Sequence, residues 1–147
     1  MAYYSIFPEK DATIYSHPDR LGLNTGKDEV LELLEEKDSS KEVYYPSRFL
    51  IKFKNTEIKD IIENKINGSD FKTHLEVFAT EHKSLHTNHI IQVYAVSQSW
   101  DEGTGRFKNS PSSSNGVTWE MRTDTGSNAR AKWTTSSCAS NSTGSSC

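Results

Sequence analysis

The sequence has few apolar residues and no long apolar run. Hydrophobic residues make up 33% of the 147 positions and the mean hydropathy is −0.71. A membrane-spanning helix needs about 20 consecutive apolar residues, and no stretch comes near that. Residues 1–10 do not place an apolar segment after a basic one, so no secretory signal is expected. We therefore expect one domain of ordinary size, without a membrane partner, whose core is small or is completed from outside the chain.

Motifs for catalysis, phosphate binding or metal binding are missing as well. No nucleophile stands at a spacing that would pair it with a base. The only two cysteines, Cys138 and Cys147, lie in a Ser-rich stretch without nearby histidines, which makes a poor zinc site. They are expected to be free thiols of a protein made in a reducing cytoplasm. We expect no catalytic residue, no cofactor, no metal and no enzymatic activity.

The net charge of −3 argues against a nucleic-acid partner. Residues 1–82 carry 11 Lys+Arg and 16 Asp+Glu, whereas residues 83–147 carry 6 and 4. Such acidic runs are usually solvated, although a patch that meets a basic partner is the alternative. The acidic run consists of Asp28, Glu29, Glu32, Glu35, Glu36 and Asp38.

Alternation of apolar and polar residues predicts an all-β domain. The longest alternating stretch, residues 90–100, ends at a Gly-rich acidic turn just after Trp100. Residues 29–36 fit either a helix or a strand, and closely flanking turn signals favour the strand. The other predicted strands are residues 11–16, 47–53, 73–80 and 117–121.

One short helix is predicted over residues 56–66. Its isoleucines recur at helical spacing and form a single apolar stripe, and Asn55 or Thr56 can cap its start. We expect the whole stripe to be buried, so that Ile62→Asp would be costly. The stripe consists of Ile58, Ile61, Ile62 and Ile66.

The order of these elements resembles the DNRLRE-type β-sandwich domain, which also occurs as a carbohydrate-binding module. The specific parts are the strand at residues 47–53 (SRFLIKF) and the corner at residues 96–105 (VSQSWDEGTG). The resemblance covers roughly residues 6–133. Its weaker parts are residues 7–15, 24–26, 75–78 and Trp119.

This resemblance implies a jelly-roll-like antiparallel β-sandwich over residues 1–135, followed by a Ser-rich tail at residues 136–147. Family members continue with further strands after the region that corresponds to Trp133. We therefore expect a sandwich that is incomplete at its C-terminus and is closed by a neighbouring subunit, because an unpaired sheet edge is a site of strand pairing.

The opening stretch, residues 4–18 (YSIFPEKDATIYSHP), looks like virion structural proteins of tailed cyanophages. This likeness implies a virion protein of the neck, tail or capsid exterior, bound to other virion proteins and to copies of itself. The alternative is a carbohydrate-binding module that recognises polysaccharide on the host surface.

Three tryptophans and three carboxylates are the candidate site residues. Trp100 is expected to be a buried anchor of its corner, whereas Trp119 and Trp133 could either pack or stack on a sugar. Asp101 and Glu102 are expected to form a plain acidic turn. The alternative is calcium binding, with Asp11 from the first strand as a further ligand. A metal site at the histidines is not expected. These are His74, His82, His86 and His89.

Overall fold

The computed structural model describes residues 3–38, 40–66, 70–80, 90–125 and 130–134. The chain divides into two compact units, which are described separately. The first unit comprises residues 1–6 and 55–97, and the second comprises residues 7–54 and 98–147. All described strands pair antiparallel, and one short α-helix accompanies them, so the predicted sheet-rich fold is confirmed. The described residues include no helix with the length and apolar character needed to cross a membrane.

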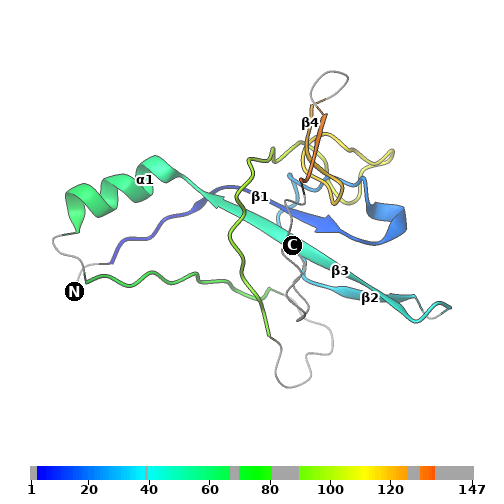
Figure 1. Ribbon diagram of the computed structural model, residues 1–147, viewed down its shortest axis with the longest axis horizontal. Coiled ribbons are helices and arrows are strands. Elements are labelled where there is room, and N and C mark those ends of the chain that lie inside the picture. The colour runs from blue at the N-terminus through cyan, green and yellow to red at the C-terminus, as the bar shows by residue number, and fades with distance from the viewer. Residues whose placement is uncertain (1–2, 39, 67–69, 81–89, 126–129, 135–147) are drawn as a thin grey trace. The chain divides into compact units, whose positions relative to one another are not determined.

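A three-stranded sheet is the main element of the second unit. Its strands are β1 (Pro8–Tyr15), β2 (Glu35–Asp38) and β3 (Val43–Phe53), and β3 lies between the other two (Figure 1). The predicted strands at residues 11–16 and 47–53 are thus confirmed. A short 3₁₀ turn, η1 (Pro18–Arg20), follows β1.

Residues 29–36 are a strand only at their end. β2 starts at Glu35, where it forms a hairpin with β3 from Glu35 opposite Pro46 to Asp38 opposite Val43. Before it, Leu34 is joined to Ser47 by one backbone and one side-chain bond. The Ser47 N–H donates to the Leu34 carbonyl at 2.8 Å, and the Leu34 N–H donates to the Ser47 hydroxyl at 2.9 Å. The helical alternative for this stretch is wrong.

A second, two-stranded sheet is formed by β4 (Met121–Asp124) and β5 (Arg130–Lys132). The strand predicted at residues 117–121 is misplaced, because a tight turn occupies that position. The Thr118 N–H donates to the Met121 carbonyl at 2.8 Å, and the Met121 N–H donates to Thr118 Oγ1 at 3.0 Å. β4 therefore begins only at Met121.

The core lies on one face of β1 and β3. Ala12 and Ile14 of β1 pack there against Trp100 and Val117, with Leu50 of β3 at the border. Trp100 is 4% exposed, so the prediction of a buried anchor is confirmed. The ammonium group of Lys10 lies 4.4 Å from the centre of its ring and donates a hydrogen bond to its backbone carbonyl.

A buried asparagine joins three loops of the second unit. Asn24 is fully buried, and its Nδ2 donates to the carbonyls of Glu102 at 2.7 Å and Val117 at 2.8 Å. Its Oδ1 accepts from the N–H groups of Gly105 at 2.8 Å and Gly26 at 3.3 Å. All four bonding positions of one amide are used.

Two glycines allow these loops to approach Asn24 closely. Gly103 has φ +84° and Gly116 has φ +111°, a region of backbone space that favours glycine. A Cβ on Gly103 would lie 2.0 Å from the Asn115 carbonyl oxygen, and one on Gly116 would lie 2.3 Å from the Cα of Gly103. Any larger residue would separate the loops that Asn24 joins.

Side chains bond to the outer edge of β1. The hydroxyl of Thr25 accepts from the Thr13 N–H at 3.0 Å and donates to the Thr13 carbonyl at 2.8 Å. The Asp11 N–H donates to Glu102 Oε1 at 3.2 Å. These bonds occupy backbone groups through which another strand would pair.

In the first unit, α1 (Asn55–Asp60) continues into a π-helical turn, η2 (Ile61–Lys65). The predicted helix at residues 56–66 is confirmed in position, but its buried stripe is not. Ile61 is 7% exposed, whereas Ile62 is 42% exposed. The π turn, closed by the Ile66 N–H on the Ile61 carbonyl at 2.9 Å, is wider than an α-helical turn and breaks the 3.6-residue period. A charge at position 62 would not be buried, so the large loss of stability expected for Ile62→Asp has no basis in the structure.

The strands predicted at residues 73–80 and 90–100 are wrong. Both segments run as drawn-out chain without regular structure (Figure 1). Neither pairs with another strand among the described residues, and strand alternation by itself supplies no partner.

We predict that Asn24→Ala lowers the free energy of unfolding of the second unit by ~3 kcal/mol or more. The substitution leaves the buried Val117 carbonyl without its donor and the buried Gly105 N–H without its acceptor. Each such loss costs about 1–3 kcal/mol. Thermal unfolding monitored by tryptophan fluorescence measures the effect, because all three tryptophans belong to the second unit. Asn115→Ala, an exposed asparagine of the same corner, is the matched control and should change little. An equal loss in both variants would contradict the role of Asn24.

Candidate assembly surface

Two segments of the first unit expose most of its large apolar side chains. Phe78 and Ile90 are each 86% exposed, and Val93 is 73% exposed. Ile61 is the only buried residue among those described in this unit. Exposed apolar patches of this kind mark interaction sites. We define the assembly surface as Phe71, Leu75, Val77, Phe78, Ile90, Ile91, Val93, Tyr94 and Val96, all of them more than 40% exposed.

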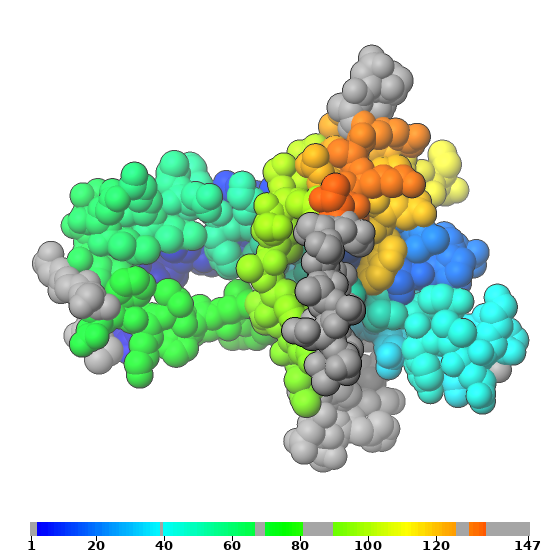
Figure 2. Space-filling view, viewed as in Figure 1, coloured from blue at the N-terminus to red at the C-terminus, as the bar shows by residue number. Residues whose placement is uncertain are grey.

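Residues 90–97 are exposed on both of their alternating faces. Ile91 and Val93 have one parity, Ile90 and Tyr94 have the other, and all four are exposed. In Figure 2 these residues form a continuous yellow-green strip on the face in view. A strand that is apolar on both faces is typical of a sheet covered on both sides, so this segment has the composition of an interior strand but is exposed.

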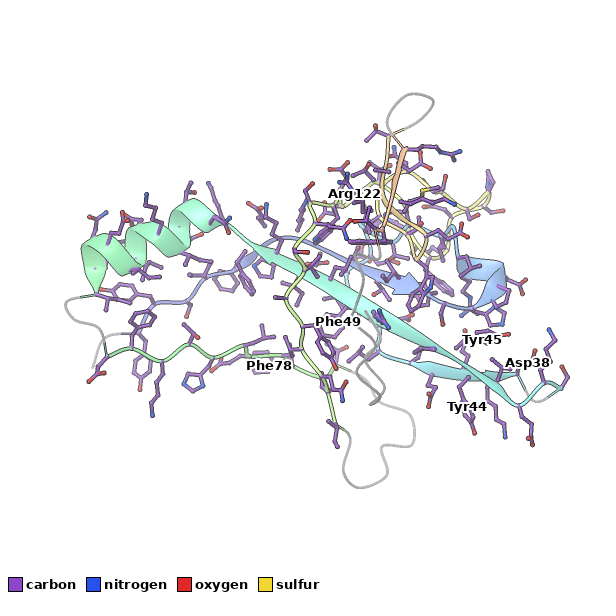
Figure 3. The ribbon with its side chains drawn as sticks, viewed as in Figure 1. Asp38, Tyr44, Tyr45, Phe49, Phe78 and Arg122 are labelled. Atoms are coloured by element: carbon purple, nitrogen blue, oxygen red, sulfur yellow. The ribbon has the colours of Figure 1, made fainter. Side chains whose placement is uncertain are left out.

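Residues 70–80 contribute the rest of the surface. Phe78, labelled in Figure 3, exposes nearly its whole ring, and Val77 is 55% exposed. All described residues of this segment are exposed, including His74. An extended chain with apolar side chains and no strand partner can add to the sheet of another protein, which would supply both hydrogen bonds and apolar cover.

The β2–β3 hairpin of the second unit is a weaker candidate. Tyr44 and Tyr45 project to opposite sides of β3 (Figure 3). Tyr44 is 52% exposed and lies 5.5 Å from the Lys37 ammonium, while Tyr45 packs edge-on to His17 at 5.0 Å. β2 is an edge strand, but it is short and highly charged, which are features that protect edges against pairing.

Half of the acidic run forms ion pairs inside the second unit. Glu29 pairs with Arg106, Glu36 pairs with Arg20 at 2.6 Å, and Asp38 pairs with Lys41. Two more members accept hydrogen bonds: Asp28 from the Phe107 N–H and Glu32 from the Tyr15 hydroxyl. Burial and the bond to Glu32 raise the pKa of Tyr15. These partners favour a solvated acidic face over a docking patch for a basic protein.

The other two tryptophans, Trp119 and Trp133, are held by contacts within the second unit. Trp119 lies under the guanidinium of Arg48 at 4.9 Å, and Trp133 donates from Nε1 to the Thr118 carbonyl at 3.0 Å. Both are partly buried against the core. This arrangement favours packing over sugar stacking for both rings.

The three candidate calcium ligands do not form one site. Glu102 accepts from the Asp11 N–H and forms an ion pair with Lys27, which supplies the positive charge that a cation would bring. Asp101 is exposed, and its backbone bonds to Arg122 and Val117. Over the described ranges, no group of three or more histidine, cysteine or carboxylate side chains could hold a metal ion.

Several sequence predictions concern residues outside the described ranges. His82, His86 and His89 belong to this group, as do Cys138 and Cys147. The Ser-rich tail at residues 136–147 does too, so its boundary stays a prediction.

We predict that Asp11→Asn raises the melting temperature at pH 7. Burial and the neighbouring Glu102 raise the pKa of Asp11, so the folded state holds this proton more tightly than the unfolded state. The contribution to stability is present below the unfolded pKa, about 3.9, and is lost as the pH rises through the folded pKa. The gain at pH 7 should stay under about 1 kcal/mol, because solvent screens this half-buried group.

Thermal unfolding at pH 7 and at about pH 3, below the unfolded pKa, measures this difference. The advantage of Asp11→Asn should disappear at the lower pH. If calcium occupied the corner, Asp11→Asn would instead lower the melting temperature at pH 7 when calcium is present, and the interpretation of a plain acidic turn would be wrong.

Comparison of the chain with protein-family models, with curated proteins and with solved structures found no match.

Proposed function

We propose that the chain is a virion structural protein of a tailed phage that works by assembling with copies of itself and with other virion proteins. The observation that carries this proposal is the assembly surface. Its apolar side chains lie on two segments that pair with no strand in the described part of the chain, and only one described residue of that unit is buried. Such a unit gains cover and backbone hydrogen bonds when it assembles.

We also propose that the two sheets form a β-sandwich. Two antiparallel sheets with a core on one face of β1 and β3 are compatible with a DNRLRE-type β-sandwich of jelly-roll kind. In this proposal, neighbouring subunits join through β-edge and loop contacts. A neck, tail or capsid-exterior position follows from the likeness of residues 4–18 to virion proteins.

A non-enzymatic role fits the use of the titratable groups at the corner. Glu102 bonds to Lys27 and to the backbone of Asp11, and Tyr15 bonds to Glu32. These groups hold loops and strands together. The proposal therefore assigns them a structural task and assigns the chain no cofactor.

The alternative is a carbohydrate-binding module, and one observation favours it. Tyr44 projects from the sheet with half of its side chain exposed. An exposed aromatic ring is a suitable platform for a sugar. In that case the hairpin, rather than the assembly surface, would carry the function.

Sedimentation of the full chain at micromolar concentration tests the proposal. We expect oligomers or aggregates for the natural sequence and weaker association for Phe78→Ser, which removes an apolar ring from the assembly surface. Tyr44→Ser is the matched control, because it removes an exposed ring from the hairpin. A stable, monodisperse monomer that loses polysaccharide binding on Tyr44→Ser would contradict the proposal and favour the glycan-binding module.

A further inference from the structure

Residues 90–98 (IIQVYAVSQ) contain no charged side chain. The other exposed segment, residues 70–80, carries Asp70, Lys72 and Glu76, and β2 carries three acidic residues and one lysine. A neutral segment can lie beside an identical segment without like-charge repulsion. It also has high β-propensity, with no proline and no glycine, as is typical of segments that pair with themselves.

The two faces of this segment differ in a way that selects its partner. One parity carries Ile91, Val93 and Ala95, which are all apolar. The other is mixed: it carries Ile90 and Val96 together with Gln92 and Tyr94. The Tyr94 hydroxyl donates a hydrogen bond to Gln92 Oε1. A partner strand should match an apolar face with an apolar face, and this requirement restricts the register.

We propose that residues 90–96 of one copy pair antiparallel with residues 90–96 of a second copy, about a two-fold axis through Val93. This inference rests on the proposed function of assembly. It adds that the partner is a second copy of the chain and that the paired segment is residues 90–96. With Val93 opposite Val93, Ile91 lies opposite Ala95 and Ile90 opposite Val96. Gln92 then lies opposite Tyr94, so both polar side chains of the segment meet each other.

A shift by one residue would place the apolar face of one copy against the mixed face of the other, because side chains alternate with period two. A shift by two would place either Gln92 opposite Val96 or Tyr94 opposite Ile90, so that a polar side chain would face an apolar one. Antiparallel pairing of identical segments makes both copies equivalent, as in most two-fold dimers.

Cysteine scanning of the full chain tests this register. In a Cys138→Ser, Cys147→Ser background, Val93→Cys should form a disulfide-linked dimer with oxidised glutathione. Directly opposed Cα atoms in an antiparallel pair lie about 4.5–5.5 Å apart, within the range that a disulfide bridges. Ile91→Cys and Ala95→Cys should dimerise poorly alone and well when mixed. Val77→Cys, as exposed as Ile91 at 55%, is the matched control.

Different outcomes overturn the inference in different ways. Equal dimer yields at positions 77 and 93 would indicate random collision. High yields at 91, 93 and 95 alike would indicate parallel pairing in register. No dimer at 93, while the unsubstituted chain still sediments as an oligomer, would reject this pairing and leave the proposed function standing. A monomeric unsubstituted chain would reject both.

A pair of charge variants gives a second readout that needs no oxidation. Val93→Lys and Val93→Glu should each weaken self-association by about tenfold, since like charges then meet across the two-fold axis. An equimolar mixture should restore it. Failure of the mixture to associate better than either variant alone, with each variant keeping the far-ultraviolet spectrum of the natural chain, would contradict the pairing of Val93 with itself.

Discussion

The amide of Asn24 is the interaction on which the second unit depends. Its two donors and its acceptor oxygen join the corner after Trp100, the loop before β4 and the turn after β1. Gly103 and Gly116 lie where a side chain would prevent this approach. A fully satisfied buried amide of this kind specifies one arrangement of its loops, and it does so here where few apolar residues are available.

The first unit has no comparable centre. Ile61 is its only buried residue among those described, and its isoleucine helix ends in a π turn that turns Ile62 outward. Apolar residues make up only 33% of the chain. Many of them lie on the exposed segments 70–80 and 90–97, so even fewer are left for a core. In the proposed account, the second unit holds itself together and the first is completed by other chains.

Part of this structure could be predicted from the sequence. Alternation correctly predicted strands at residues 11–16 and 47–53, and these two segments pair with each other. Residues 73–80 and 90–100 alternate as well, but alternation reports which side chains share a face and does not report what lies alongside. The π turn at Ile61 was not predictable from apolar spacing, since that spacing assumes 3.6 residues per turn.

The loops around Trp100 and Asn24 in the second unit were predicted only in part. Trp100 was correctly expected to be buried from its place between a strand and a Gly-rich turn. The bonding role of Asn24 was not predicted. Its Asn-Thr-Gly stretch, the Gly-Thr-Gly of residues 103–105 and the Asn-Gly of residues 115–116 are the signal for close loop contact. β5 carried no signal, because its three residues alternate too briefly.

Amide hydrogen exchange across a concentration series tests the division between a self-sufficient unit and one completed by partners most directly. Residues 47–53 of β3 should exchange slowly at every concentration, because their partner strands lie in the same chain. Residues 90–97 should exchange fast in dilute protein and slowly as the concentration rises. Slow exchange of residues 90–97 in a dilute monomer, at a rate independent of concentration, would contradict the account.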